Sequence, residues 1–129
     1  METGIKGTRT VVVTDEMTAE HVGSGMLPVY ATPEMIALVE NVASNSVAPY
    51  LEEGTGTVGT KINMDHVSAT PVGMKVTVET ELTEVDRRRL VFSVKAYDEA
   101  GLIGEGTHER FIIQNEKFLG KAQAKLDRK

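Results

Sequence analysis

A histidine, a glutamate and a threonine are the residues of this sequence whose types and spacing could do chemistry together. His66 ends residues 57–66, where alternating side chains predict a β-strand, and it falls on the apolar face with Val58. Thr32 and Glu40 lie eight residues apart in a predicted helix, a little over two turns, so both can face one sheet. A hydroxyl, a carboxylate and an imidazole that converge on one pocket could orient water or an acyl group and move protons.

Each of these residues also has an ordinary structural explanation. His66 could be a packed, hydrogen-bonded histidine rather than a catalytic base. Glu40 lies at the edge of the apolar stripe, where its stem can pack while its carboxylate reaches water. Thr32 could be the N-cap of the helix, because Pro33 and Glu34 follow it. The residues taken singly leave both explanations open.

One long helix and several strands must position these side chains. The helix is predicted to begin at Thr32 and to end at Pro49. Its apolar face is predicted to contain Met35, Ile36, Val39, Val42, Ala43 and Val47. Strands are predicted over residues 10–14, 57–66, 74–82, 90–97 and 102–113, with a short helix over residues 15–20. Short turns between the last four strands favour an antiparallel meander, so we expect an α+β fold in which a sheet wraps one helix.

The composition excludes several classes of protein. The chain has 129 residues, which suits one domain over residues 1–129, and it has no cysteine for a disulfide, a thiolate metal site or a thiol nucleophile. No apolar stretch is long enough for a membrane span and no signal peptide is evident, so we expect a cytoplasmic protein without a membrane partner. The net charge of -5 argues against nucleic acid. Two basic segments, residues 87–89 and 117–129, could meet phosphates or be solvated surface.

Five segments form a set that resembles a known family. They are VYATPEMIALVE (29–40), APYL (48–51), residues 59–66, ATPVG (69–73) and GTHER (106–110). Together they are similar to the hotdog-fold thioesterases of the fluoroacetyl-CoA thioesterase type, over nearly the whole chain.

The resemblance implies a hotdog fold, a homodimer whose sheets join, and hydrolysis of a short-chain acyl-CoA to the free acid and coenzyme A. We expect no metal and no cofactor, since coenzyme A is part of the substrate. The family residues that match Thr32, Glu40 and His66 form the catalytic set. The backbone amide matching Gly59 helps polarise the thioester carbonyl, and Arg110 matches an arginine near the site. Glu40 could be the nucleophile or the base for a water molecule.

One segment departs from the family pattern. The fluoroacetyl-specific enzyme has a phenylalanine-bearing lid ahead of its catalytic helix, whereas residues 21–28 contain no phenylalanine. We therefore expect a different or broader short-chain acyl substrate. Two other functions stay open: a non-hydrolytic acyl-CoA-binding module of the same fold, and a hotdog dehydratase acting on an acyl thioester.

Overall fold

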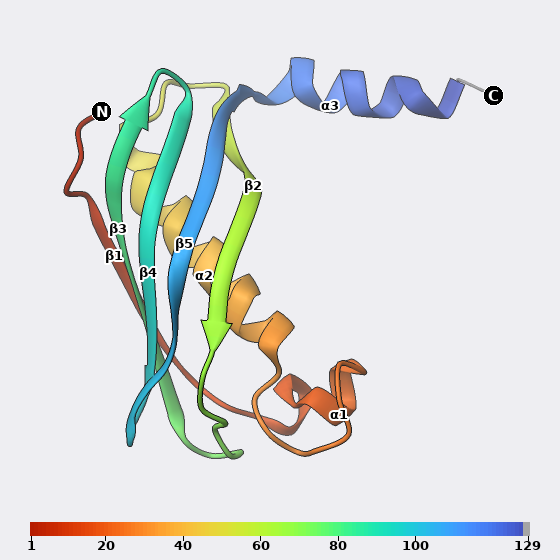
Figure 1. The fold of residues 1–129 in the computed structure, drawn as a ribbon. Helices are drawn as coiled ribbons and strands as arrows, with labels where there is room; N and C mark the ends of the chain where they lie inside the picture. The colour runs from red at the N-terminus through yellow and green to blue at the C-terminus, as the bar shows by residue number, and fades with distance from the viewer. Residues whose placement is uncertain (128–129) are drawn as a thin grey trace.

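A curved antiparallel sheet wraps a long helix in the computed structural model, which describes residues 1–127 (Figure 1). The elements in chain order are β1 (Lys6–Val12), η1 (Asp15–Met17), α1 (Ala19–Val22), α2 (Thr32–Val47), η2 (Ala48–Tyr50), β2 (Thr55–His66), β3 (Lys75–Asp86), β4 (Arg89–Asp98), β5 (Gly101–Gln114), α3 (Asn115–Gln123) and η3 (Ala124–Asp127), where η marks a 3-10 helix. The predicted α+β class, with a curved sheet wrapped around one long helix, is confirmed. The end of the predicted basic tail, Arg128 and Lys129, lies outside the described residues.

Strand β2 lies at an edge of the sheet. The strand order is β1-β3-β4-β5-β2, so β3, β4 and β5 are neighbours, while β2 pairs antiparallel with β5. The predicted four-strand meander is therefore wrong at its first strand. The connection from β2 to β3 does not form a tight hairpin but runs beside the residues that precede α2, where Tyr30 N donates to Thr70 O at 2.8 Å. This topology leaves His66 on a strand with one free edge.

The N-terminal segment also differs from the prediction. The first strand runs over Lys6–Val12 because it pairs with β3 from Lys6↔Glu81 to Val12↔Lys75. Most of its side chains are polar, so a search for alternating hydrophobic residues does not detect the start of this strand. The predicted helix over residues 15–20 divides at Thr18, whose hydroxyl accepts a hydrogen bond from His21 N and caps α1.

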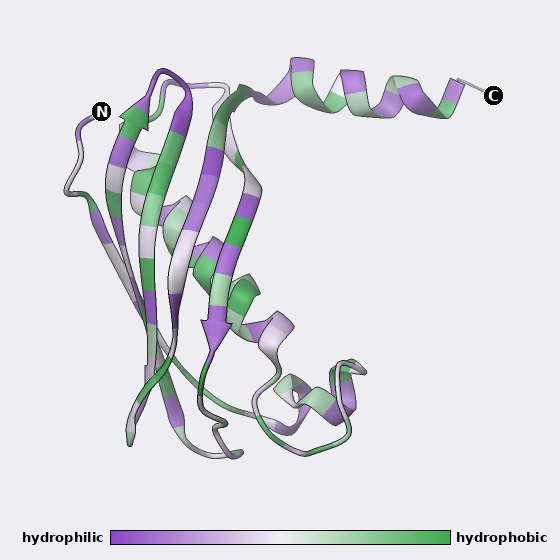
Figure 2. Ribbon diagram, viewed as in Figure 1, coloured by the Kyte–Doolittle hydropathy of each residue, from purple (hydrophilic) through white to green (hydrophobic). Residues whose placement is uncertain are grey.

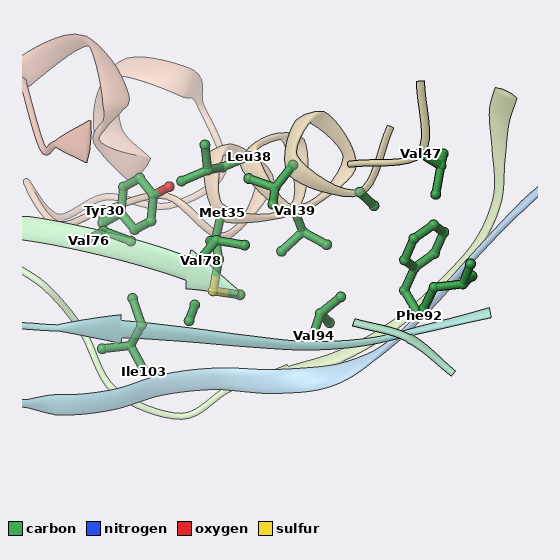
Figure 3. Packing of buried hydrophobic residues seen from close by; sticks show 14 of the residues in the cluster. Tyr30, Met35, Leu38, Val39, Val47, Val76, Val78, Phe92, Val94 and Ile103 are labelled. Carbon is green, nitrogen blue, oxygen red and sulfur yellow. The ribbon is translucent and has the colours of Figure 1, made fainter. Parts of the chain in front are cut away.

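The core lies between α2 and the inner face of the sheet. Figure 3 shows Met35 pointing from α2 toward the sheet, and Phe92 rising from β4 toward Val47. The buried helix residues are Met35, Leu38, Val39, Val42, Ala43 and Val47; Leu38 replaces the predicted Ile36, which is half-buried. Hydrophobic and hydrophilic residues alternate along the central strands (Figure 2). Burying one large aliphatic side chain contributes about 1.5–3 kcal/mol, so this packing fixes α2 against the sheet.

A β-bulge at Thr60 changes which β2 side chains face the helix. Gly59 pairs with Arg110 and Lys61 pairs with Glu109, so Thr60 is the extra residue in the ladder. One extra residue reverses the alternation of faces. The predicted face that includes both Val58 and His66 is therefore wrong before the bulge.

The two sides of the bulge contribute different residues to the inner face. Before it, Thr57 and Gly59 face α2, and Val58 lies on the outer face opposite Phe111. After it, Met64 packs against the core and His66 contacts the start of α2. The bulge thus places Gly59 and His66 on the same face of one strand.

Helix α3 extends away from the sheet beyond β5 (Figure 1). It exposes Phe118 and Leu119 among basic side chains. No helix within residues 1–127 combines the length and the apolar character that crossing a membrane requires.

Candidate active site

The start of α2 meets the end of β2 at the first candidate pair. Thr32 Oγ1 and His66 Nδ1 are 2.7 Å apart and share a hydrogen bond. Ala31 occupies the N-cap position of α2, and no side chain caps the helix. The predicted capping role of Thr32 is therefore wrong: the N-cap lies one residue earlier, Thr32 is the first residue of the helix, and its hydroxyl bonds the imidazole on β2.

His66 is suited to accept a proton. Its side chain is half-buried, and its Nε2 atom has no hydrogen-bond partner within residues 1–127. Burial lowers the pKa of His66, and a weaker backbone interaction with Ser68 opposes this effect. The imidazole is therefore neutral at neutral pH. In the tautomer that carries the proton on Nε2, Nδ1 accepts the Thr32 hydroxyl proton.

A hollow of about 290 Å³ lies beside this pair. Its lining residues are Ala19, Ser24, Val29, Tyr30, Thr32, His66, Val67, Ser68 and Ala69. Burial, and secondarily the carboxylate of Glu34, raises the pKa of Tyr30 to about 12, so its phenol stays protonated. The volume is at the small end of ligand pockets, which run from about 300 Å³ upward, and it suits a small acyl group.

A larger hollow of about 490 Å³ lies over the outer face of β1, β3 and β4. Lys6, Glu79 and Lys95 are among its lining residues, and none of the five predicted site residues is. The smaller hollow is the better candidate because a hydroxyl and a neutral imidazole border it.

Glu40 belongs to a second group near the middle of β2. Its Oε2 atom lies 3.6 Å from Arg110 Nη1, in an ion pair that joins a side chain 46% exposed to one only 8% exposed. A Cβ atom on Gly59 would lie 2.5 Å from Glu40 Oε2 and 3.2 Å from Arg110 Nη1. Glycine is thus the residue that leaves room for the carboxylate.

Hydrogen bonds from two strands hold the Arg110 guanidinium. Arg110 Nε donates to Thr57 Oγ1 at 2.8 Å, and Nη2 donates to Thr57 O at 2.9 Å. The remaining contact joins Nη1 to His108 Nε2 at 3.2 Å. Burial lowers the pKa of Arg110 and Glu40 raises it, but a guanidinium stays charged throughout the working pH range. A fixed positive charge therefore faces Glu40.

The sequence reasoning missed His108, which is 1% exposed and stacks on Phe92 with ring centroids 6.1 Å apart. A signal was available in residues 101–114. Alternation there places His108 and Arg110 on the same face as Ile112, which packs against the core. Two polar side chains on a core-facing surface of a strand indicate a buried polar network.

The two groups stay apart within one chain. Eight helical residues span about 12 Å, and no hydrogen bond or ion pair links Glu40 to Thr32 or His66 among residues 1–127. Glu40 also does not line the hollow beside His66. The structure therefore brings Thr32 to His66, and Glu40 to Gly59 and Arg110, but it does not join all three catalytic candidates in one pocket.

The basic turn between β3 and β4 is partly neutralised. Arg89 donates to Glu84 at 2.8 Å and to Glu109 at 2.9 Å. Arg87 Nε lies 3.7 Å from Asp86. Arg89 is therefore held by acidic neighbours, which favours the surface explanation for that residue.

Comparison with known proteins decides the family. A family model described as fluoroacetyl-CoA-specific thioesterase matches residues 13–116. The chain belongs to this family. It is 47% identical, over 97 residues, to the fluoroacetyl-CoA thioesterase of Streptantibioticus cattleyicolor, covering 75% of this chain and 70% of that protein.

Two solved structures are also similar to this thioesterase. One is a mutant of a fluoroacetyl-CoA-specific thioesterase in complex with fluoroacetate and CoA; it is 41% identical, with a TM-score of 0.87, over 92% of this chain and 99% of that chain. The other is a Thermus thermophilus hypothetical protein of the thioesterase superfamily, 31% identical, with a TM-score of 0.91, over 98% and 94% of the two chains. The predicted resemblance is confirmed, and so is the prediction of an enzyme that hydrolyses acyl-CoA thioesters.

Replacing Gly59 should separate catalysis from stability in this thioesterase. In Gly59→Ala the closest atom to the new Cβ is Glu40 Oε2, the end of a half-exposed side chain that can move, so we expect the free energy of unfolding to fall by only about 1 kcal/mol. Misplacing the Glu40 carboxylate should lower kcat by about 10²-fold. Gly106→Ala is the matched control, because its Cβ would meet the backbone of Asn63 and should destabilise the fold. Urea unfolding and steady-state kinetics measure both effects, and full turnover by Gly59→Ala would refute the placement of Glu40.

The stability of the thioesterase should fall as the pH drops below about 6.5. Burial is the largest influence on the pKa of both His66 and His108 and lowers it, so the unfolded chain takes up protons before the folded one. Their contribution is complete above the unfolded pKa and is lost as pH falls through the folded pKa. Urea unfolding at several pH values between 5.5 and 7.5 should show this slope, and His66→Phe or His108→Phe should reduce it. An unchanged slope in both variants contradicts the assignment.

Proposed function

We propose that this thioesterase hydrolyses short-chain acyl-CoA thioesters to the free acid and coenzyme A, using Thr32, Glu40 and His66 within one domain of residues 1–129. The observation that carries the proposal is the 2.7 Å hydrogen bond between Thr32 Oγ1 and His66 Nδ1 beside a hollow of about 290 Å³. A hydroxyl bonded to a neutral imidazole is an arrangement that can orient an acyl group and move protons during attack on its carbonyl.

The chemistry divides between the two groups of residues. An oxygen, either of Glu40 or of a water molecule that gives a proton to Glu40, attacks the thioester carbonyl carbon, and the carbon–sulfur bond breaks to release coenzyme A. If Glu40 itself attacks, a water molecule then hydrolyses the acyl–Glu40 anhydride to the free acid. The backbone amide of Gly59 polarises the carbonyl oxygen, a type of contact worth about 3–4 kcal/mol in other enzymes. Thr32 and His66 orient the acyl group and relay to the departing thiolate a proton that comes from the attacking water molecule. Arg110 holds the carboxylate in place.

The substrate we propose is broader than that of the named relative. That relative is a fluoroacetyl-CoA thioesterase, and the hollow beside Thr32 is small enough to suit a two- to four-carbon acyl group of similar size. Residues 21–28 are exposed and contain no phenylalanine to close over the acyl group. We therefore propose acetyl-CoA and other short acyl-CoAs as substrates besides fluoroacetyl-CoA. A cytoplasmic location stays a prediction.

We propose a homodimer in which two copies pair along β2. This edge strand has 12 residues, against 7 in the other edge strand, β1, so it offers the longer row of unpaired backbone groups. Antiparallel self-pairing about a two-fold axis near Ile62 and Asn63 would oppose Gly59 of one copy to His66 of the other. Glu40 of each copy would then approach the Thr32 and His66 pair across the interface. A site shared in this way accounts for the separation of the two groups within one chain.

Acyl-CoA hydrolysis should be strongest for short chains and should depend on the proposed residues. Release of coenzyme A from two- to twelve-carbon acyl-CoAs can be followed with a thiol-reactive dye. Glu40→Ala and His66→Ala should each lower kcat by about 10²–10⁴-fold. Glu79→Ala, which removes an exposed carboxylate on the outer face of β3, is the control and should keep full activity. No release from any acyl-CoA would overturn the proposal, as would undiminished release by both site variants.

A heterodimer of two inactive variants tests the shared site. His66→Ala and Glu40→Ala subunits carrying different affinity tags are co-expressed, and the mixed dimer is isolated. If each site uses both copies, one of its two sites is intact and about half of the wild-type activity returns. If each site lies within one copy, the mixed dimer stays inactive. Sedimentation of the wild type as a monomer at micromolar concentration would also rule out the dimer.

A further inference from the structure

His108 is a buried histidine to which the proposed reaction gives no role. It lies on β5, is 1% exposed and uses both ring nitrogens: Nδ1 is 2.8 Å from Lys61 O, and Nε2 is 3.2 Å from Arg110 Nη1. The flat face of the ring lies over Phe92, its cross-strand neighbour on β4. Its position is thus fixed by packing and by two polar contacts.

The two partners determine the state of the imidazole. A carbonyl oxygen only accepts, so Nδ1 must carry the proton that it donates to Lys61 O. A guanidinium only donates, so Nε2 must offer its lone pair to Arg110 Nη1. His108 is therefore a neutral imidazole with its proton on Nδ1. Burial is the largest influence on its pKa and lowers it, which agrees with this state.

This lone pair controls the end of Arg110 that faces Glu40. Thr57 holds Nε and Nη2, but Nη1 has only His108 and the Glu40 carboxylate at 3.6 Å as polar partners within residues 1–127. Without an acceptor at Nε2, Nη1 would be buried with the Glu40 carboxylate at 3.6 Å as its single remaining polar partner within residues 1–127. The guanidinium would then turn to recover a hydrogen bond.

We propose that neutral His108 is a positioning residue, which accepts a hydrogen bond from Arg110 Nη1 and so fixes the guanidinium that holds Glu40 beside Gly59. The proposal rests on the proposed role of Glu40 in thioester hydrolysis. His108 touches no reacting atom; it acts through Arg110. The His108 ring is fully buried on β5, so it can hold Arg110 in one position. Arg110 in turn fixes the Glu40 carboxylate, although the Glu40 side chain is 46% exposed.

Three substitutions separate the two nitrogens of His108. His108→Gln keeps an acceptor near the position of Nε2, His108→Asn keeps a donor near that of Nδ1, and His108→Phe keeps the ring alone. We expect His108→Phe and His108→Asn to lower kcat by about 10-fold or more with KM changed by less than about 3-fold, because a misplaced carboxylate affects the chemical step. His108→Gln should restore most of kcat. Val94→Ala, a core truncation on β4 away from Arg110, is the stability control and should keep kcat.

A double-mutant cycle tests whether His108 acts through Arg110. In an Arg110→Met background, His108→Phe should lower kcat no further, because the contact it removes is already absent. The proposal would be overturned if His108→Phe lowered kcat by the same factor in the Arg110→Met background as in the wild type. Equal kcat values for the glutamine, asparagine and phenylalanine variants at position 108 would also overturn it. A merely structural role predicts losses that follow stability and persist without Arg110.

Long-range ¹H–¹⁵N NMR of the wild type gives a readout independent of activity. At pH 7 His108 should show a protonated Nδ1 and an unprotonated Nε2, and Arg110 should show resolved Nη signals that His108→Phe removes. An imidazolium, or a proton on Nε2, would overturn the proposal. If the wild type hydrolyses no acyl-CoA, the proposed function fails, whereas the NMR signals still decide whether His108 positions Arg110.

Discussion

The bulge at Thr60 is the constraint on which the rest of the site depends. It adds one residue to β2 without a partner on β5, and so it turns both Gly59 and His66 toward α2. A regular strand would send one of them to the outer face, because their spacing of seven residues is odd. The pair formed by Thr32 and His66 and the contact between Glu40 and Gly59 therefore lie on the same face of the sheet only because of this bulge. The carbonyl of Lys61, directly after the bulge, also anchors His108.

Much of the fold follows from local pattern, and the parts that fail need long-range information. The helix from Thr32 and the strand ending at His66 were predictable because apolar periodicity and the Thr-Pro-Glu start are local signals. The pairing of β2 with β5, rather than β3, depends on how residues 67–74 pass beside Tyr30, and no local signal records that. The bulge cannot be predicted from local pattern either, because it is defined by the register between β2 and β5 at Gly59 and Arg110.

The site shows the same division. The types of Thr32, Glu40 and His66 were readable, and helical spacing placed the first two on one helix. Alternation alone could not reveal that Thr32 bonds the histidine instead of capping α2, because that choice depends on where the first turn begins. Nor could it show Glu40 at a distance from His66. Burial increases from the half-exposed Glu40 side chain through Arg110 to His108, so a partly solvated acid is held by two buried side chains.

Residues 23–28 form a loop after α1 that is closed by two backbone hydrogen bonds at its base, where Ala19 N donates to Val29 O at 2.8 Å and Glu20 N to Leu27 O at 3.2 Å. The loop is exposed and contributes nothing to the buried core. Apart from Gly23, whose φ of 87° favours glycine, substitutions there disturb no buried apolar packing, while Ser24 still borders the hollow. One short loop can therefore reshape the rim of the hollow while the packing of the helix and sheet beneath it stays unchanged.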